Sequence, residues 1–286
     1  MTQRPSLMDR RALFSTAAAA ALLAATGVSA AGMPQRGGRL RMALSGAQRS
    51  DAWNRGDGLF MQVARQGLVF DTLTEVAADG SLRGELATGW TSAEGARVWY
   101  FDLRDDVHFH DGRRFGAADV VASAAGFDDG VVSAVGPYRV AFTLDTPDPR
   151  LPMRMAQPEF YISAAHAPGQ GIGTGLYRVK HFTPGQRLLT ERVAAHYKDG
   201  TAGWFDEVEL TSIPSETVRG QALAEYLVDA VDVKEAGTLR SLSEIILSPS
   251  ARSPMQAVSS AVAMPGRISS LRPLDNLRAA ERWWFA

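Results

Sequence analysis

The sequence predicts a mixed α/β (α+β) fold, and two patterns support this fold class. Short segments alternate apolar and polar residues with a period of two, as half-buried strands do, and longer segments of helical spacing lie between them. The strands and helices do not follow the regular βαβ order of doubly wound parallel sheets. With 286 residues, of which 45% are hydrophobic, the chain can bury one large core or two smaller ones.

Residues 1–30 are predicted to be an export signal and are set apart from the fold. Arg10 and Arg11 precede an Ala-rich stretch from Leu13 to Ala25, in an order that resembles a twin-arginine motif. The small residues before position 31 predict cleavage near Ala30. A single membrane anchor is the alternative, but the stretch is short and weakly hydrophobic for a membrane span.

The composition argues against several kinds of partner. The formal net charge is −1, and the sequence contains no cysteine. Such a charge balance gives no electrostatic attraction to nucleic acid or to an anionic membrane surface. Without cysteine we expect neither a disulfide framework nor lipid attachment. An exported protein without a lipid anchor is retained by an outer membrane, so we predict a periplasmic location in a two-membrane bacterium.

The first strand is predicted over residues 39–44, where apolar residues occupy every second position. A polar loop from Ser45 to Gly58 follows it. The apolar-rich segment from Leu59 to Phe70 then predicts a helix.

Residues 85–121 are the most informative part of the sequence. A helix is predicted to end at Trp90, and two strands are predicted over 99–104 and 107–110 because their apolar residues alternate. Asp111-Gly112 predicts a tight turn after them. Gly116 is a plausible N-cap for the next helix, with a carboxylate three residues later at its positive end.

Four further strands and one helix are expected in the remaining chain. Alternation predicts strands over 138–144, 177–181, 187–193 and 208–212. The Pro-Gly centre of residues 183–186 suits a type II turn between the second and third of these strands. Ser215 can cap a helix, whose apolar face is predicted to carry Val218, Ala222, Leu223, Tyr226 and Leu227.

Several short motifs, taken together and in order, resemble the first lobe of family 5 of the bacterial extracellular solute-binding proteins, the peptide/nickel class of ABC transporter receptors. The resemblance covers roughly residues 38–232. Arg114, Gly116 and Leu176 depart from the pattern of the family. The motifs that carry the resemblance are Phe70–Leu73, Glu85–Trp90, Phe101–Arg104, Val107–Gly112, Ala118–Val120, Gly173–Tyr177, Ala222–Leu223 and Val228–Asp229.

The resemblance implies a periplasmic-binding-protein-like lobe I over residues 31–264, with the second lobe largely absent. Residues 272–280 resemble the segment that opens the second lobe, and the sequence stops shortly after them. Residues 265–286 are interpreted as a C-terminal helix and aromatic tail. Trp283, Trp284 and Phe285 either pack this tail onto the domain or form a patch for a partner chain, including a homodimer.

No catalytic residue, cofactor or metal site is predicted. His108 and His110 lie two apart on a predicted strand, but no third ligand is evident for zinc or nickel. The glycine-rich segment 171–175 lacks the Lys-Ser/Thr and the βαβ unit of a phosphate-binding loop. We find no nucleophile elbow either, so the sequence predicts a protein that is not an enzyme.

Two loops are candidate ligand contacts, because loops at the end of strands expose backbone N–H groups and short polar side chains. Ser45, Gly46 and Ala47 are the first candidates, and Gly173 and Thr174 are the second. Simple turn geometry is the competing interpretation of both.

The resemblance implies the periplasmic substrate-binding component of a peptide-class ABC importer. Such a protein binds a small peptide or similar solute without catalysis and delivers it to an inner-membrane ABC permease. The alternative is a truncated or repurposed lobe that acts as an interaction module. No nucleic-acid partner is predicted.

Overall fold

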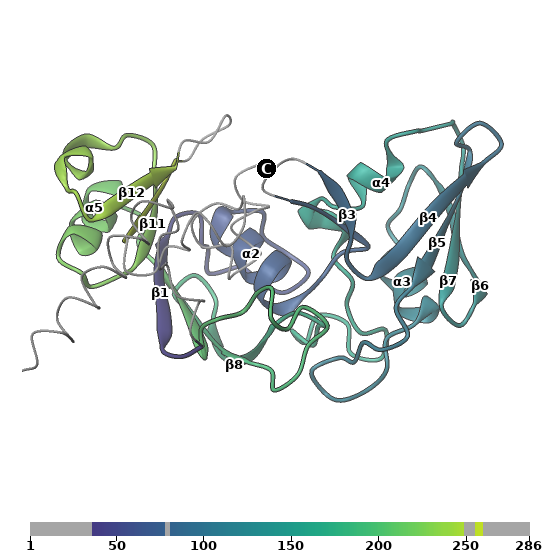
Figure 1. Ribbon diagram of the computed structural model, residues 1–286, viewed down its shortest axis with the longest axis horizontal. Helices are drawn as coiled ribbons and strands as arrows, with labels where there is room; N and C mark the ends of the chain where they lie inside the picture. The colour runs from purple at the N-terminus through teal and green to yellow at the C-terminus, as the bar shows by residue number, and fades with distance from the viewer. Residues whose placement is uncertain (1–35, 78–80, 249–254, 260–286) are drawn as a thin grey trace, which may run out of the picture. The chain divides into compact units, whose positions relative to one another are not determined.

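The computed structural model describes residues 36–77, 81–248 and 255–259 of the chain (Figure 1). The described residues form a mixed α/β fold with one seven-stranded, one four-stranded and one two-stranded sheet, as the sequence predicts. The predicted export signal, the C-terminal helix and the aromatic tail lie outside these ranges, and so does the tail-mediated homodimer. The boundaries of the predicted lobe, 31–264, stay a prediction.

The seven-stranded sheet has the strand order β12-β13-β11-β1-β10-β9-β8. Strand β1 is parallel to its neighbours β10 and β11, and the other pairs are antiparallel. Three parallel strands therefore end at the same edge of the sheet. The strands span β1 Arg39–Leu44, β8 Tyr177–Thr183, β9 Arg187–Arg192, β10 Glu207–Ser212, β11 Ala230–Val233, β12 Ile245–Ser248 and β13 Met255–Ser259.

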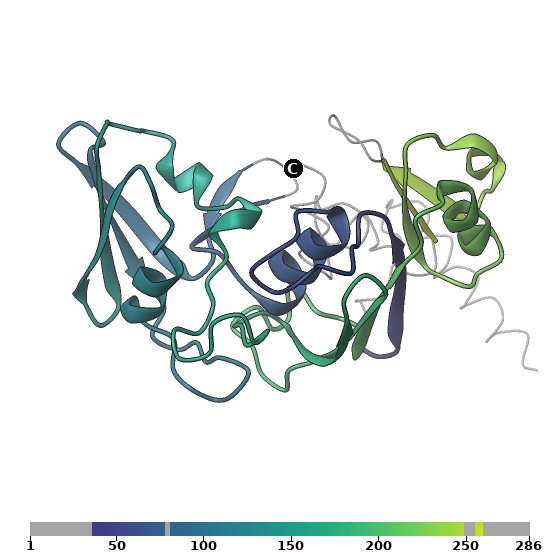
Figure 2. The same ribbon diagram turned by 180° about the vertical axis from the view of Figure 1, so that it is seen from behind.

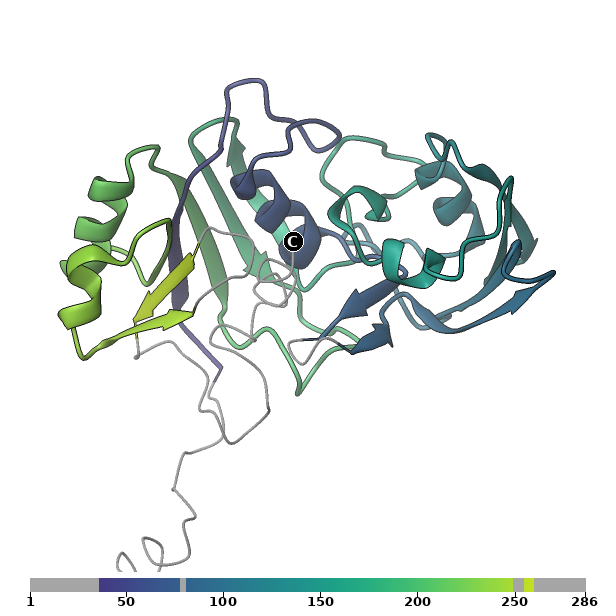
Figure 3. The ribbon, with the colours of Figure 1, turned by 90° about the horizontal axis from the view of Figure 1, so that it is seen from above.

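The two faces of this sheet are covered differently, because successive strand residues point to opposite faces. Leu40, Met42 and Leu44 join a core with helix α2 (Leu59–Val63) and the π-helical segment η1 (Ala64–Val69). Ala43 joins a separate core with α5 (Glu216–Ala224). Figure 3 shows α2 and α5 on opposite sides of β1.

The four-stranded sheet is antiparallel throughout, with the order β4-β5-β7-β6 (Figure 2). Helix α3 (Ala117–Ser123) packs against this sheet, and the two share a separate core that includes Phe101, Val120 and Phe142. The strands are β4 Ala87–Ala93, β5 Val98–Leu103, β6 Gly130–Gly136 and β7 Arg139–Leu144. The remaining elements are the strands β2 Thr74–Val76 and β3 Leu82–Gly84, the helix α4 Leu151–Arg154, and the 3-10 turns η2 Pro158–Phe160 and η3 Gly237–Ser241.

Most predicted strands and turns are confirmed. The predicted strands 39–44, 138–144 and 208–212 match β1, β7 and β10. The β8–β9 hairpin turns at Gly185, whose φ is +72°, and the Gln186 N–H donates to the Thr183 carbonyl oxygen at 3.1 Å. Helix α3 begins after Gly116, whose N–H donates to Asp119 Oδ2 at 3.0 Å.

Residues 85–90 do not form the predicted helix. Strand β4 begins at Ala87, and Trp90 lies opposite Phe101 of β5 with the ring centroids 6.3 Å apart. Cross-strand pairing of two aromatic residues therefore overrides the local pattern.

Residues 107–110 do not form a strand either. His108 makes only an isolated bridge to Arg114, because the Asp111-Gly112 turn folds the chain back at once. The turn itself is confirmed, and Gly112 has a φ of +86°. Strand β6, after residue 129, was not predicted.

The helix after Ser215 is capped as predicted, but its apolar face is shorter. Ala222 and Leu223 are buried, whereas Val218 is exposed. The helix ends at Ala224, and Tyr226 and Leu227 lie beyond it with more than half of their surface exposed, at 55% and 60%. Tyr226 has a φ of +58°, the left-handed conformation that often ends a helix.

Candidate functional site

The carboxyl ends of β11, β1 and β10 form one edge of the large sheet. Ligands of α/β proteins often bind beyond the carboxyl ends of parallel strands, because loops with free polar groups start there. The predicted contacts Ser45, Gly46 and Ala47 follow β1 directly at this edge.

A buried polar network holds the edge together. Asp232 of β11 accepts hydrogen bonds from the Ser45 N–H at 2.8 Å and from the Ser45 hydroxyl at 2.7 Å. Arg219 of α5 forms an ion pair with the same carboxylate at 3.0 Å. Arg219 also donates to the carbonyl oxygens of Ile213 and Pro214, which follow β10. One arginine and one aspartate therefore connect the ends of all three parallel strands.

Gly46 and Ala47 carry backbone N–H donors next to this network. Within the described part of the chain, neither N–H group takes part in a hydrogen bond. Gly46 is exposed and Ala47 is half-buried. The φ of Gly46 is +81°, and a Cβ there would lie 2.9 Å from the Leu59 nitrogen, so the position requires glycine. The edge thus offers two N–H donors on a fixed support.

The second pair of predicted contacts, Gly173 and Thr174, lies in a buried turn. A Cβ on Gly173 would lie 1.9 Å from the Val69 carbonyl oxygen, so this backbone packs tightly against η1. The Thr174 hydroxyl donates to Asp71 Oδ2 at 2.9 Å. These contacts favour the turn interpretation, and none of them reaches the loop that follows β1.

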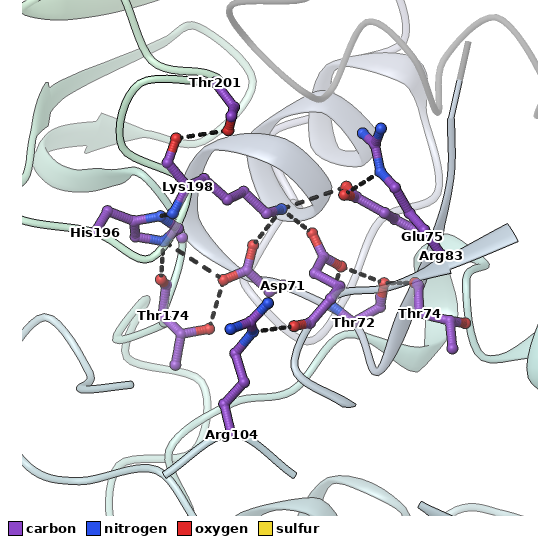
Figure 4. A network of polar contacts seen from close by, with 12 residues as sticks. Asp71, Thr72, Thr74, Glu75, Arg83, Arg104, Thr174, His196, Lys198 and Thr201 are labelled. Carbon is purple, nitrogen blue, oxygen red and sulfur yellow. Dashed lines mark hydrogen bonds and ion pairs between the residues drawn. The ribbon is translucent and has the colours of Figure 1, made fainter. Parts of the chain in front are cut away.

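Thr174 belongs to a buried charged cluster, which is drawn in Figure 4. The Lys198 ammonium lies 3.4 Å from Asp71 Oδ1 and 3.3 Å from Glu75 Oε2, and it also contacts Glu85 Oε1. Arg83 forms a further ion pair with Glu75 at 2.7 Å. Sequence reasoning missed this cluster because its members are up to 127 positions apart. Two cations therefore pair with three carboxylates, and these ion pairs connect the segments that carry them.

His196 extends the cluster and has a defined tautomer. Its Nδ1 accepts the Lys198 N–H at 3.1 Å, so its Nε2 carries the proton and donates to the Thr174 carbonyl oxygen at 2.8 Å. Its ring stacks on Tyr197, with centroids 4.3 Å apart. Beside it, a cavity of ≈ 310 Å³ is lined by Asp106, Val107, His108, Thr174, Ala195, His196, Tyr197 and Asp199.

The two histidines considered as a metal pair do not act together. His108 is exposed, whereas His110 Nε2 contacts the Gly175 carbonyl oxygen at 2.8 Å. Nδ1 of His110 is buried and has no hydrogen-bond partner among the described residues, and burial lowers the pKa of this imidazole. Among residues 36–77, 81–248 and 255–259, no group of three or more His, Cys, Asp or Glu is placed to hold a metal ion. Within the same ranges, every helix is too short or too polar to cross a membrane.

Comparisons with known proteins agree with the fold and the resemblance. The model of the bacterial extracellular solute-binding proteins, family 5 Middle, matches residues 81–240. The nickel-binding periplasmic protein of Escherichia coli K12 is 41% identical over 66 residues, which are 23% of this chain and 12% of the relative. The HTH-type transcriptional regulator SgrR of Salmonella typhi is 32% identical over 168 residues, 53% of this chain and 29% of the regulator.

Solved structures of periplasmic binding proteins have a similar fold. The periplasmic binding protein AgaA of A. tumefaciens R10, in complex with agropinic acid, has a TM-score of 0.65 and 25% identity, over 73% of this chain and 47% of that one. DppA of Helicobacter pylori, in complex with the peptide STSA, has a TM-score of 0.65 and 21% identity, over 76% and 51%. The chain therefore spans about half the length of these solved proteins and less of the curated relatives.

Proposed function

Because the chain belongs to family 5 of the bacterial extracellular solute-binding proteins, we propose that it is the substrate-binding component of a peptide-class ABC importer. It binds a small peptide or a similar solute without catalysis and delivers it to an inner-membrane ABC permease. The match over residues 81–240 carries this proposal. Export to the periplasm, with cleavage near Ala30, belongs to the same proposal.

The solute contacts the edge formed by Ser45, Gly46 and Ala47. The N–H groups of Gly46 and Ala47, which have no acceptor among the described residues, suit the carbonyl and carboxylate oxygens of a peptide, which are hydrogen-bond acceptors. The buried Asp232 and Arg219 fix the strand ends beneath these donors. Pre-positioned donors favour binding, because less conformational entropy is lost when the solute arrives.

The second candidate function is an interaction module without transport. The likeness to a protein named as a transcriptional regulator, over 53% of this chain, favours it, because a related segment there is part of a protein that is not named as a transporter. The two functions differ in one measurable property: only the first requires a solute that the chain releases to a permease.

A thermal-shift screen of the purified chain against di- to pentapeptides and Ni²⁺ tests the first function. A solute at a hundredfold excess over its Kd stabilises the folded state by about 2.7 kcal/mol, which raises the Tm of a domain of this size by roughly 5–10 °C. Unchanged melting curves across the whole series would count against solute binding and favour the interaction module.

Two matched glycine variants locate the site. Gly46→Ala introduces a Cβ at a φ of +81° and 2.9 Å from a neighbouring backbone atom, whereas Gly95→Ala introduces one at a φ of +65° with no atom within 4 Å. Both variants carry the strain of the left-handed conformation, but only Gly46→Ala disturbs the edge. We expect Gly46→Ala to weaken solute binding at least tenfold and Gly95→Ala to leave it unchanged. Equal Kd values for both variants would place the site elsewhere.

A further inference from the structure

The loop that follows β1 is closed at its base. The Phe60 N–H donates to the Ser45 carbonyl oxygen at 3.2 Å. Gly58 packs so closely on Gly46 that a Cβ on Gly58 would lie 1.9 Å from the Gly46 carbonyl oxygen. Compact loops whose two ends meet in this way are Ω-loops and are frequently functional. Residues 45–58, the Ω-loop, therefore carry the proposed solute contacts near their first end.

One buried side chain holds the Ω-loop from inside. Ala52 and Arg55 exchange backbone hydrogen bonds of 3.2 and 3.0 Å and so form a miniature hairpin within the loop. Nη2 of Arg65 donates to the Ala52 carbonyl oxygen at 2.9 Å and also to that of Arg55. Since the carbonyl groups of Ala52 and Arg55 both accept from one guanidinium, Arg65 fixes the position and the orientation of the hairpin.

The backbone of η1 brings Arg65 to this position. The Phe70 N–H donates to the Arg65 carbonyl oxygen at 2.8 Å, a π-type bond over five residues, and Gln66 and Gly67 depart from helical geometry. Such π segments occur frequently at functional sites. Arg65 itself is buried, with the Tyr161 ring 5.8 Å from its guanidinium carbon.

The tip of the Ω-loop is anchored as well. The Tyr161 hydroxyl donates to the Trp53 carbonyl oxygen at 2.8 Å. The Trp53 ring is buried against Phe182 at 4.9 Å and Phe70 at 5.8 Å between ring centroids. A Cβ on Gly171 would lie 2.6 Å from Trp53 Nε1. Opening the loop would expose this tryptophan to water, which opposes a lid-like movement.

We propose that Arg65 is the positioning residue of the Ω-loop and that the solute-binding edge is preformed. Arg65 affects solute binding through the loop, because its guanidinium is buried and donates hydrogen bonds to loop carbonyl groups. The preformed loop places the Gly46 and Ala47 donors before the solute arrives, which lowers the entropic cost of binding. The effect on affinity rests on the proposed function, whereas the effect on the loop does not.

Trypsin provides a test of the loop that needs no solute. Arg55 is exposed in the Ω-loop, and the carbonyl group that trypsin would attack there is one of the two that Arg65 holds. We compare the purified full chain with its Arg65→Met and Arg65→Lys variants under native conditions and follow cleavage after Arg55 by mass spectrometry. We expect cleavage at least tenfold faster in Arg65→Met, and an intermediate rate in Arg65→Lys, which keeps the charge but not the planar pair of donors.

A matched control separates the loop from general destabilisation. Leu103→Ala removes a buried side chain from the core of the four-stranded sheet, so it lowers the Tm without touching the Ω-loop. If Arg55 is cleaved as fast in Leu103→Ala as in Arg65→Met, or at the wild-type rate in Arg65→Met, the positioning role is wrong.

Binding data then test the consequence for affinity. For any peptide that stabilises the wild type in the thermal-shift screen, we expect Arg65→Met to raise the Kd at least tenfold and Leu103→Ala to leave it within twofold. An unchanged Kd in Arg65→Met would contradict the preformed edge. A wild type that binds no peptide would contradict the proposed function instead, and the cleavage rates would still decide the role of Arg65.

Discussion

An exposed group of ion pairs and a buried ion pair of the large sheet contribute to stability in different ways. Across β1, β10, β9 and β8, seven charged side chains form an exposed ladder of ion pairs, namely Arg39, Arg178, Lys180, Arg187, Glu191, Glu207 and Glu209. At the carboxyl edge, the single pair of Arg219 and Asp232 is almost fully buried, with side chains 4% and 3% exposed.

Exposure to water determines how much each ion pair contributes to stability. Exposed pairs are screened and hold long side chains in one geometry, so each contributes little to stability. A buried pair gains little over an apolar pair, but removing one partner leaves an uncompensated charge away from water. The number of ion pairs is therefore a poor guide to their contribution to stability. The buried pair of Arg219 and Asp232 fixes the strand ends more firmly than the exposed pairs do.

The largest effect is expected at the buried cluster around Lys198. Lys198→Met leaves Asp71, Glu75 and Glu85 buried without the ammonium group that lies among them. We expect a loss of about 3–5 kcal/mol in the free energy of unfolding, measured by urea denaturation. Lys180→Met removes an exposed lysine of the ladder and is the control. Equal losses in the two variants would contradict the contrast between buried and exposed charges.

Arg219→Met should have the next largest effect. Asp232 keeps its bonds to Ser45 but loses its buried countercharge, at a cost of about 3 kcal/mol in unfolding free energy. The double variant Arg219→Met with Asp232→Asn removes both charges and should recover part of that loss. Urea denaturation of the wild type, both single variants and the double variant forms a double-mutant cycle. Additive losses would mean that the two residues do not act as a pair.

His110 predicts a smaller, pH-dependent effect. Burial lowers the pKa of its imidazole, although the nearby Gly175 carbonyl group and Asp71 oppose that shift. The unfolded chain therefore binds a proton near pH 6.5 that the folded chain takes up only at lower pH, so stability falls as the pH drops below about 6.5. His110→Gln should flatten the decrease of Tm between pH 7.5 and 5. If the Tm of His110→Gln falls as steeply as that of the wild type, other groups cause the pH dependence.

The smallest effect is expected in the exposed ladder. The hydrogen bond from Arg178 lowers the pKa of Glu191, so any stability that this pair adds is present at neutral pH and is lost as the pH falls through that lowered pKa. At pH 7, Glu191→Gln should change the Tm by less than about 2 °C, and 0.5 M salt should reduce the difference further. A change in Tm as large as that caused by Arg219→Met would contradict the smaller contribution expected of exposed ion pairs.

The sequence predicts these regions unequally, for physical reasons. Local alternation correctly placed β1, β7 and β10, and Pro184-Gly185 marked the hairpin turn, because such signals arise within a few residues. The helix expected to end at Trp90 was wrong, since this segment pairs with β5, where the partner Phe101 lies eleven positions further along the chain. Burial and partners of Lys198, Arg219 and Arg65 depend on contacts distant in sequence, and nothing in the local pattern indicates them.

The candidate site was predictable only in part. Ser45, Gly46 and Ala47 were chosen because they follow a strand, and in the structure they lie at a sheet edge where the N–H groups of Gly46 and Ala47 have no acceptor among the described residues. Gly173 and Thr174, in the loop before the strand predicted over 177–181, were the second choice, but they are buried against Val69 and Asp71. A sequence pattern marks where a strand ends and carries no information on whether the following turn is open to solvent.

The proposed function depends on solute binding by the N–H donors of Gly46 and Ala47. An NMR titration tests it most directly, with the full chain labelled with ¹⁵N in glycine and alanine and a tetrapeptide selected in the thermal-shift screen as the probe. We expect the amide signals of Gly46 and Ala47 to move with the peptide concentration, while the signal of Gly95 stays in place. Saturable binding that leaves the Gly46 and Ala47 signals unmoved would contradict it.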